Sequence, residues 1–243
     1  MRIIPLDTPE QVDLQAAKLM ADAVAARRDA VIGLSTGRTT GSIHAAFVKL
    51  VRESGLDCSG TTFFGLDEVA GVPREYAGAC YTMLKNELIG PLGIPEEHFL
   101  MLPVKSDNWE RDCSAFVREL ERRGGVDLLF LGLGENGHLG FNQPGSPFGG
   151  GAWLSVMYPE LEERIRRETG TPAHKPLGGV TLGLKDIMHA RRLVLAAKGL
   201  SKAATVKKMI EGPVTEDLPA SVLQLHPCCT VLLDREAASN LSL

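Results

Sequence analysis

Short apolar runs alternate along this chain with segments of helical periodicity, and this alternation narrows the possible folds more than any other feature. The runs at 30–34 ("AVIGL"), 61–66 ("TTFFGL") and 126–134 ("VDLLFLGLG") have the length and apolar content of buried strands. Apolar residues at 10–28 and 42–51 recur with helical spacing. Strands that alternate with helices predict a Rossmann-like α/β fold, in which helices cover both faces of a mostly parallel sheet.

The rest of the chain continues this alternation and gives no sign of a second domain. One segment, 146–176, interrupts it with Gly- and Pro-rich flanks around a charged helical stretch at 159–168, and we interpret it as an insertion that acts as a lid. No internal repeat or low-complexity linker divides the 243 residues, so we expect a single domain spanning residues 1–243. The remaining expected strands are 98–103, 179–184, 192–199 and 229–234, and the remaining expected helices are 78–90, 108–123 and 201–212.

Composition excludes several classes of protein. The formal charge is −4 and no run of like charge occurs, so we expect no nucleic-acid partner. The N-terminus lacks the apolar core of a signal peptide and no stretch approaches the roughly 18 apolar residues of a membrane span, so we expect a cytoplasmic protein without membrane contact. The five cysteines have no C-x-x-C spacing, which favours reduced thiols and no metal site.

The loop "STGRTTG" at 35–41 joins an expected strand to the N-terminus of an expected helix. Glycines and small hydroxyl side chains leave the N–H groups of such a helix start exposed, and its dipole favours an anion such as phosphate. A helix cap that binds no ligand has a similar sequence, and no G-K-[ST] of a Walker loop follows. Lys202 stands at the start of another expected helix, where a bound anion would explain a cation, although a solvent-exposed lysine is the alternative.

Two carboxylates, Asp67 and Glu68, follow the apolar strand at 61–66. Successive residues leaving a strand point in different directions, so only one of the two can face a given substrate atom. Partial burial at a strand end tunes a carboxylate for general-base chemistry. The alternative is a loop-capping aspartate beside a solvated glutamate.

The stretch "LGLGENGHLGFNQPGS" at 131–146 contains the spelling G-x-G-x-x-G, but the residues after its third glycine are too rich in Gly and Pro to open a helix, which argues against a dinucleotide site. The glycines permit tight backbone paths. Near them, the amides of Asn136, Asn142 and Gln143 surround His138, which we predict to transfer protons. A structural histidine is the alternative interpretation.

These loops together resemble one known family. "GLSTGRTTGSIH", "GLDEVAGVP", "VDLLFLGLGENGHLGFNQPGS", "GLSKA" and "ASVLQLHP" are similar, in order, to signatures of the amino-sugar-6-phosphate deaminases, also called glucosamine- or galactosamine-6-phosphate isomerases, and the resemblance spans residues 1 to about 234. "NGHLG" and "TLGLKDI" are closer to the galactosamine branch. The resemblance implies a NagB/RpiA/CoA-transferase-like fold and conversion of a 2-amino-2-deoxyhexose 6-phosphate to the ketose 6-phosphate and ammonia, with no metal or other cofactor.

The resemblance also implies roles for particular residues. Asp67 would take the proton from C2 and return it to C1, and His138 would open the sugar ring, with Asn136 and Gln143 beside it in the catalytic set. Because the family's usual N-E-P motif has a glutamate where this chain has Gln143, the imidazolium would lose carboxylate support, and ring opening would be slow. The predicted substrate-binding residues are Ser35, Thr36, Gly37, Arg38, Thr39, Glu68, Gly137 and Lys202.

Two alternatives stay open beside the deaminase. A 6-phosphogluconolactonase-like hydrolase would share the fold and a related histidine loop, although that class usually has D-E-R where this chain has "DEV". A catalytically impaired sugar-phosphate-binding protein is the other, suggested by Gln143. For all three we expect a small-molecule sugar-phosphate ligand, and we allow for a homo-oligomer.

Overall fold

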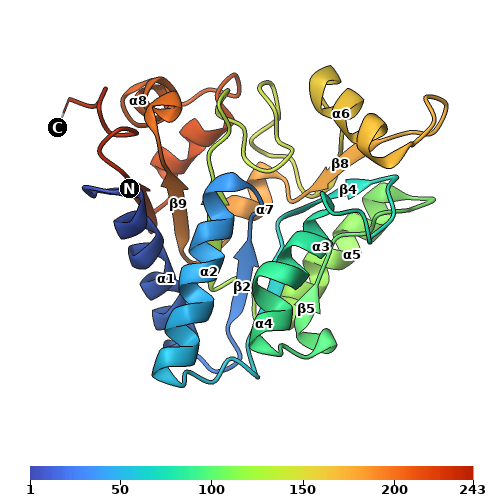
Figure 1. Ribbon diagram of the computed structural model, residues 1–243. Helices are drawn as coiled ribbons and strands as arrows, with labels where there is room; N and C mark the ends of the chain where they lie inside the picture. The colour runs from blue at the N-terminus through green and yellow to red at the C-terminus, as the bar shows by residue number, and fades with distance from the viewer. Residues whose placement is uncertain (243) are drawn as a thin grey trace.

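The computed structural model describes residues 1–242, with the side chain of Arg38 outside the described part. Its centre is a seven-stranded sheet in which every neighbouring pair of strands is parallel (Figure 1). In spatial order, its strands are β1 (Arg2–Pro5), β10 (Cys229–Leu233), β9 (Leu193–Ala197), β6 (Leu128–Gly132), β2 (Val31–Leu34), β3 (Thr62–Gly65) and β5 (Phe99–Leu100).

Side chains of the central strands alternate between two apolar cores, one on each face of the sheet. Ile32 and Phe63 pack with α1 and α2 on one face, whereas Val31 and Phe64 belong to the core on the other face, which contains residues of α5, α7 and α8. Because both faces are covered, these strands are apolar without alternation. The predicted mostly parallel sheet with helices on both faces is therefore confirmed.

Helices follow most strands, as expected. Between residues 80 and 92 the expected single helix is divided into two α-helical turns around a π-helical one. The helices are α1 (Pro9–Ala26), α2 (Arg38–Ser54), α3 (Cys80–Leu84), η1 (Lys85–Ile89), α4 (Gly90–Leu92), η2 (Glu96–His98), α5 (Trp109–Arg122), α6 (Pro159–Thr169), α7 (Leu184–Met188), η3 (Leu200–Lys202), α8 (Ala203–Glu211) and η4 (Pro219–Leu225).

A second, antiparallel sheet stands above the carboxyl ends of the main strands, and the sequence did not predict it. Its strands are β4 (Asp67–Ala70), β8 (Gly178–Thr181) and β7 (Trp153–Ser155). Asp67 and Glu68, which follow the strand expected at 61–66, begin the new strand β4, and the strand expected at 179–184 contributes β8 to this small sheet. The pairing of β4 with β8 joins residues more than 100 positions apart, so no local pattern reveals it. The helix α6 lies beside this sheet (Figure 1).

The topology fixes where the loops of interest meet. The strands β2 and β6 are neighbours in the sheet. The connection after β2 leads to β3 on one side of this pair, and the chain after β6 reaches β9 on the other side, so the two connections diverge between β2 and β6. Ligands of open parallel sheets bind beyond the carboxyl ends of strands at such a point. None of the helices among residues 1–242 has the length and apolar content needed to cross a membrane.

Candidate active site

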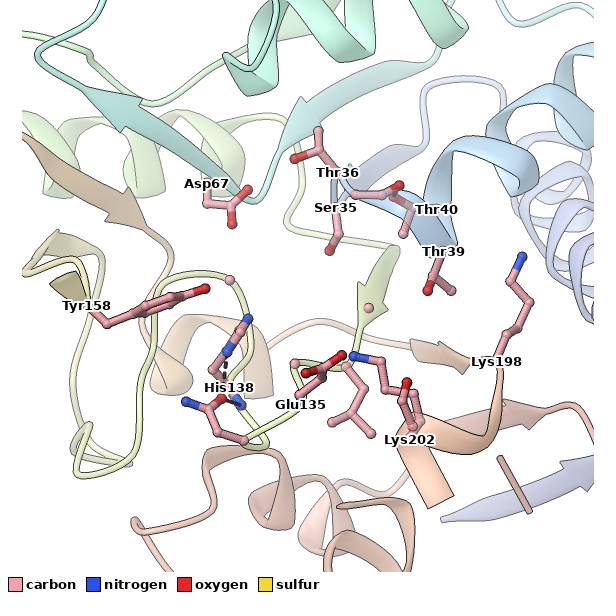
Figure 2. Close-up of a pocket in the computed structure, with 17 residues that line it drawn as sticks. Ser35, Thr36, Thr39, Thr40, Asp67, Glu135, His138, Tyr158, Lys198 and Lys202 are labelled. Carbon is pink, nitrogen blue, oxygen red and sulfur yellow. Dashed lines mark hydrogen bonds between the residues drawn. The ribbon is translucent and has the colours of Figure 1, made fainter. Parts of the chain in front are cut away.

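A cavity of about 780 Å³ opens at the carboxyl ends of β2, β6 and β9 (Figure 2). Four segments contribute to it: the predicted phosphate loop at 35–41, the strand end at Asp67, the loop that contains His138, and residues 198–202. It is lined by Ser35, Thr36, Gly37, Thr39, Thr40, Asp67, Gly132, Leu133, Gly134, Glu135, Asn136, His138, Gly140, Tyr158, Lys198, Ser201 and Lys202.

One wall of the cavity is the turn from β2 into α2. Gly37 is the N-cap of this 17-residue helix, with φ of 141°, and no side chain caps the helix start among the described residues. The hydroxyl of Ser35 donates to the carbonyl of Phe130 at 2.8 Å. The first N–H groups of a helix lack intrahelical acceptors, so this wall can bind an anion through the backbone. The prediction that the Arg38 side chain binds substrate lies outside the described residues.

Two lysines line the cavity near this wall. Lys202, which we predicted from its place at a helix start, lies at the end of η3. Lys198, four positions before Lys202 in the sequence, was not predicted as a site residue. Its Nζ lies 2.6 Å from Oδ1 of Asp13 and 2.8 Å from the hydroxyl of Ser42, so it joins α1 to α2 at the cavity edge.

Asp67 is the first residue of β4, and its carboxylate points into the open space opposite the histidine loop (Figure 2). Its Oδ2 lies 3.3 Å from the position that a Cβ on Gly140 would take, and Gly140 has a φ of +57°, so the close approach of the two segments needs a glycine. Burial, and secondarily the charge of Glu68, raises the pKa of Asp67 to about 7, against the opposing hydrogen bond from Cys80. A carboxylate with such a pKa suits proton transfer at neutral pH.

Glu68, predicted to bind substrate, does not line the cavity. Its side chain is fully buried and accepts backbone N–H groups from Val69 and Cys80 at 2.8 Å and from Tyr81 at 2.7 Å. Burial raises the pKa of this carboxyl, while the three N–H donors oppose that rise. Glu68 therefore caps the start of α3, and neighbouring strand residues point apart as predicted.

His138 is held by one neighbouring amide. Its Nδ1 lies 2.7 Å from Oδ1 of Asn136, which also accepts the backbone N–H of His138 at 3.2 Å. The amide nitrogen of Asn136 donates to Oε1 of Gln143 at 3.0 Å, which fixes the orientation of Asn136. Because Oδ1 is an acceptor, Nδ1 carries the ring proton and Nε2 carries the lone pair.

Gln143 and Gly137 lie in the same loop but outside the cavity lining. Gln143 contacts Asn136 and not the imidazole, so its influence on His138 passes through a second amide. Gly137 has φ of +85°, and a Cβ there would lie 2.2 Å from a methyl of Leu218. Its backbone carbonyl accepts the N–H of Ala220 at 2.9 Å, so Gly137 fastens the loop to η4.

The electrostatic surroundings keep His138 neutral. Burial, and then the nearby charge of Lys202, lowers the pKa of His138, while Glu135 opposes the shift. Tyr158, at the N-terminus of α6, places its ring centroid 6.5 Å from that of His138 and closes one side of the cavity. Glu135 and Tyr158 were not predicted as site residues; Tyr158 directly precedes the helical stretch expected at 159–168 in the segment 146–176.

Among the described residues, no group of three or more His, Cys, Asp or Glu side chains could hold a metal ion. The cavity instead joins a helix N-terminus and two lysines to a carboxylate and a neutral imidazole. This set of groups can hold an anion at one end and move protons at the other.

Comparison with known proteins shows which family has a similar sequence. A family model described as "Glucosamine-6-phosphate isomerases/6-phosphogluconolactonase" matches residues 7–231. A glucosamine-6-phosphate deaminase of Clostridium botulinum (strain Loch Maree) is 34% identical over 243 residues, all of both chains. One of Corynebacterium kroppenstedtii is 37% identical over 241 residues, 99% of this chain and 93% of that protein.

Solved structures agree with these matches. A protein described as a monomeric glucosamine-6-phosphate deaminase and a missing link of the NagB superfamily has a TM-score of 0.91 at 30% identity, over 99% of this chain and all of that one. A 6-phosphogluconolactonase from Trypanosoma cruzi shares the fold, with a TM-score of 0.77 at 23% identity over 100% and 97% of the two chains.

Fold and cavity thus define an α/β protein of the NagB superfamily. More particularly, the chain belongs to the enzyme family of glucosamine-6-phosphate isomerases and 6-phosphogluconolactonases. The family resemblance read from the loops is confirmed. The relatives named here are glucosamine-6-phosphate deaminases and give no support to the galactosamine branch.

Proposed function

We propose that this enzyme converts glucosamine 6-phosphate and water to the ketose 6-phosphate and ammonia. The observation that carries this proposal is that Asp67 and His138 line one cavity together with the N-terminus of α2 and Lys202. A sugar phosphate fixed by its phosphate would bring C1 and C2 to these two side chains, and such positioning accounts for much of an enzyme's rate enhancement. The names of the similar relatives support the same reaction.

The phosphate end of the substrate would bind at the start of α2. Gly37 and Thr39 of this helix start line the cavity, where unpaired backbone N–H groups of the first turn can bind an anion, and Lys202 supplies a positive charge. Lys198 adds a second positive charge at the edge, shared with Asp13. A doubly charged phosphate is the group that this combination suits.

His138 would open the sugar ring. Its Nε2 carries a lone pair because Nδ1 donates to Asn136, and the lowered pKa keeps the ring neutral at neutral pH. Nε2 takes the proton of the anomeric hydroxyl and delivers it to the ring oxygen as the C1–O5 bond breaks, which leaves the open-chain aldehyde.

Asp67 would carry out the isomerisation. Its carboxylate takes the C2 proton, and the electron pair of the broken C2–H bond forms the C1–C2 double bond. The π electrons of the C1 carbonyl move to O1, which takes a proton from solvent to give the enolamine; a proton returns to solvent when water later adds at C2. The proton taken from C2 returns to C1, which gives an imine at C2. Water adds to this imine and ammonia leaves, so one water is consumed for each ammonia released. The raised pKa of Asp67 suits a group that gains and loses a proton within one cycle.

Ring opening is the step affected by Gln143, which stands where the usual motif of the family that this sequence resembles has a glutamate. Both amides behind the imidazole, Asn136 and Gln143, are neutral, so no carboxylate in that chain of hydrogen bonds stabilises the imidazolium. We expect the reaction to be slow at this step and Gln143→Glu to accelerate it. Tight binding of the sugar phosphate without turnover, with turnover restored by Gln143→Glu, would favour the catalytically impaired binding protein.

Ammonia release from glucosamine 6-phosphate, compared with that from galactosamine 6-phosphate, tests the function and the substrate together. Higher kcat/KM for the glucosamine compound supports the proposal, and the reverse order restores the galactosamine branch. Loss of 6-phosphogluconolactone without ammonia release from either amino sugar would contradict the proposal and favour the hydrolase. A homo-oligomer stays a prediction for sedimentation analysis, and the similar solved deaminase is described as monomeric.

A further inference from the structure

Cys80 lies between the two ends of the cavity without lining it. It is the first residue of α3 and its side chain is 5% exposed. Its Sγ lies 3.5 Å from Oδ1 of Asp67 and 3.2 Å from Oγ1 of Thr36. One buried thiol therefore contacts both the carboxylate at the start of β4 and the loop that follows β2.

The protonation of the Cys80 thiol determines which group donates in each of its two hydrogen bonds. Burial and the charges of Asp67 and Glu68 raise the pKa of Cys80 well above its ordinary value, so the group is a thiol at neutral pH. A thiol has one proton to donate and a sulfur that accepts weakly. Ionised Asp67 can only accept, so the S–H points to Oδ1, and the hydroxyl of Thr36 donates to the sulfur.

The backbone of Cys80 is fixed by the neighbouring strand. Glu68, adjacent to Asp67 on β4, accepts the N–H groups of Cys80 and Tyr81 at 2.8 and 2.7 Å. Successive residues of β4 thus hold Cys80 from two sides: Glu68 holds its main chain, and Asp67 receives its thiol. This arrangement leaves the S–H little freedom to point elsewhere.

We propose that Cys80 is a positioning residue for Asp67: its S–H orients the carboxylate towards the substrate and its sulfur ties that carboxylate to Thr36 in the phosphate loop. The contact itself is independent of the reaction, whereas its effect on turnover rests on the proposed function. If a bound phosphate moves the hydroxyl of Thr36, the contact of that hydroxyl with Sγ of Cys80 changes, and with it the hydrogen bond from Cys80 to the carboxylate of Asp67.

Other titratable groups also face Asp67, and the test has to separate them from Cys80. Glu68 stands beside it on β4. Across the cavity are Glu135, His138, Tyr158, Lys198 and Lys202. A substitution at Cys80 leaves all of these in place, so a change in the titration of Asp67 reports the thiol. Cys58 provides a matched control: it is also 5% exposed, and within the described part of the chain its sulfur has only the carbonyl of Leu56 as a hydrogen-bond partner, at 3.9 Å.

Carboxyl carbon NMR titration of Asp67 tests the contact without any turnover. Removing the donor in Cys80→Ala should raise the pKa of Asp67 by about 0.5 to 1 unit, whereas Cys80→Ser, which keeps a donor, should return it to the wild-type value or below. Cys58→Ala should leave it unchanged. An unchanged Asp67 titration in Cys80→Ala, or equal upward shifts in the alanine and serine variants, would overturn the inference.

The pH profile of ammonia release then tests the consequence. The acidic limb of kcat should move to higher pH in Cys80→Ala and return in Cys80→Ser, with KM changed less than kcat. If the wild-type enzyme releases no ammonia, the proposed function fails and the NMR result still decides the role of Cys80. If wild-type turnover is normal and the acidic limb of Cys80→Ala matches it, the inference about Cys80 fails and the proposed function stands.

Discussion

Oδ1 of Asn136 lies 2.7 Å from Nδ1 of His138 and 3.2 Å from its backbone N–H, so a single amide oxygen fixes both the ring and the main chain of the histidine. A neutral partner at this place orients the imidazole without adding charge. Because burial already lowers the pKa of His138, the uncharged partner leaves the ring as a base and disfavours the imidazolium.

Replacing the amide of Asn136 by a carboxylate should change the pKa of His138. In Asn136→Asp, a negative charge within hydrogen-bond distance of Nδ1 should raise the pKa of His138 by at least about 1 unit. The titration of the ring protons by NMR measures this directly. Asn86→Asp, on η1, serves as a control for an added charge. An unchanged His138 titration in Asn136→Asp would contradict the contact.

Lys202 should act on binding more than on chemistry. Lys202→Met should raise the KM for the amino-sugar phosphate by about 10-fold or more, because a charged partner of the phosphate is lost. Lys208→Met removes an exposed lysine of α8 and should leave KM unchanged. Equal effects of the two substitutions, or a loss confined to kcat, would place the phosphate elsewhere.

Glu68 should contribute to stability and not to substrate binding. Glu68→Gln replaces one carboxylate oxygen by an N–H₂ group that cannot accept from the start of α3. We expect the free energy of unfolding to fall by about 2 kcal/mol, measured by denaturant titration. Glu53→Gln on α2, whose side chain is 67% exposed, is the control and should leave the unfolding midpoint unchanged.

The fold was largely predictable from the sequence because the main sheet obeys local rules. Apolar runs and the helical periodicity between them identify β2, β3, β6 and the helices α1 and α2, since burial on both faces leaves a continuous apolar signal. The strand β4 gave no such signal. It begins with two acidic residues, and its pairing with β8 depends on a segment more than 100 residues away.

The candidate site was predictable where a side chain's place follows from its own loop. Asp67, His138 and Lys202 stand at strand ends or helix starts, and the parallel sheet brings such loops to one edge. Cys80 and Tyr158 reach the site through α3 and α6, whose packing no local pattern encodes. Glu68 directly follows Asp67, but the alternation of the strand turns its side chain into the core. Gln143 lies in the same loop as His138, but its side chain contacts Asn136 outside the cavity lining.

Stability should depend on pH through Asp67. Because the pKa of Asp67 is raised to about 7 in the folded protein, above its ordinary value of 3.8, the folded state binds more protons than the unfolded state between these values. The contribution of Asp67 to stability therefore falls as pH rises from about 4 to about 7. Asp67→Asn, which cannot ionise, should unfold at a higher temperature than the wild type at pH 8.

The same thermal unfolding measurement supplies its own control. At pH 4 the carboxyl of Asp67 is protonated in the folded protein, so the two proteins should have similar unfolding temperatures there. A stabilisation of Asp67→Asn that is equal at pH 4 and pH 8, or a destabilisation at pH 8, would contradict the raised pKa.

Exchange of the C2 proton of glucosamine 6-phosphate with deuterium oxide, followed by proton NMR, tests most directly whether Asp67 moves that proton. The wild-type enzyme should exchange it, and Asp67→Asn should slow exchange about 1,000-fold while binding of the sugar phosphate changes no more than a few-fold. Exchange in Asp67→Asn at the wild-type rate would contradict the assignment of the base.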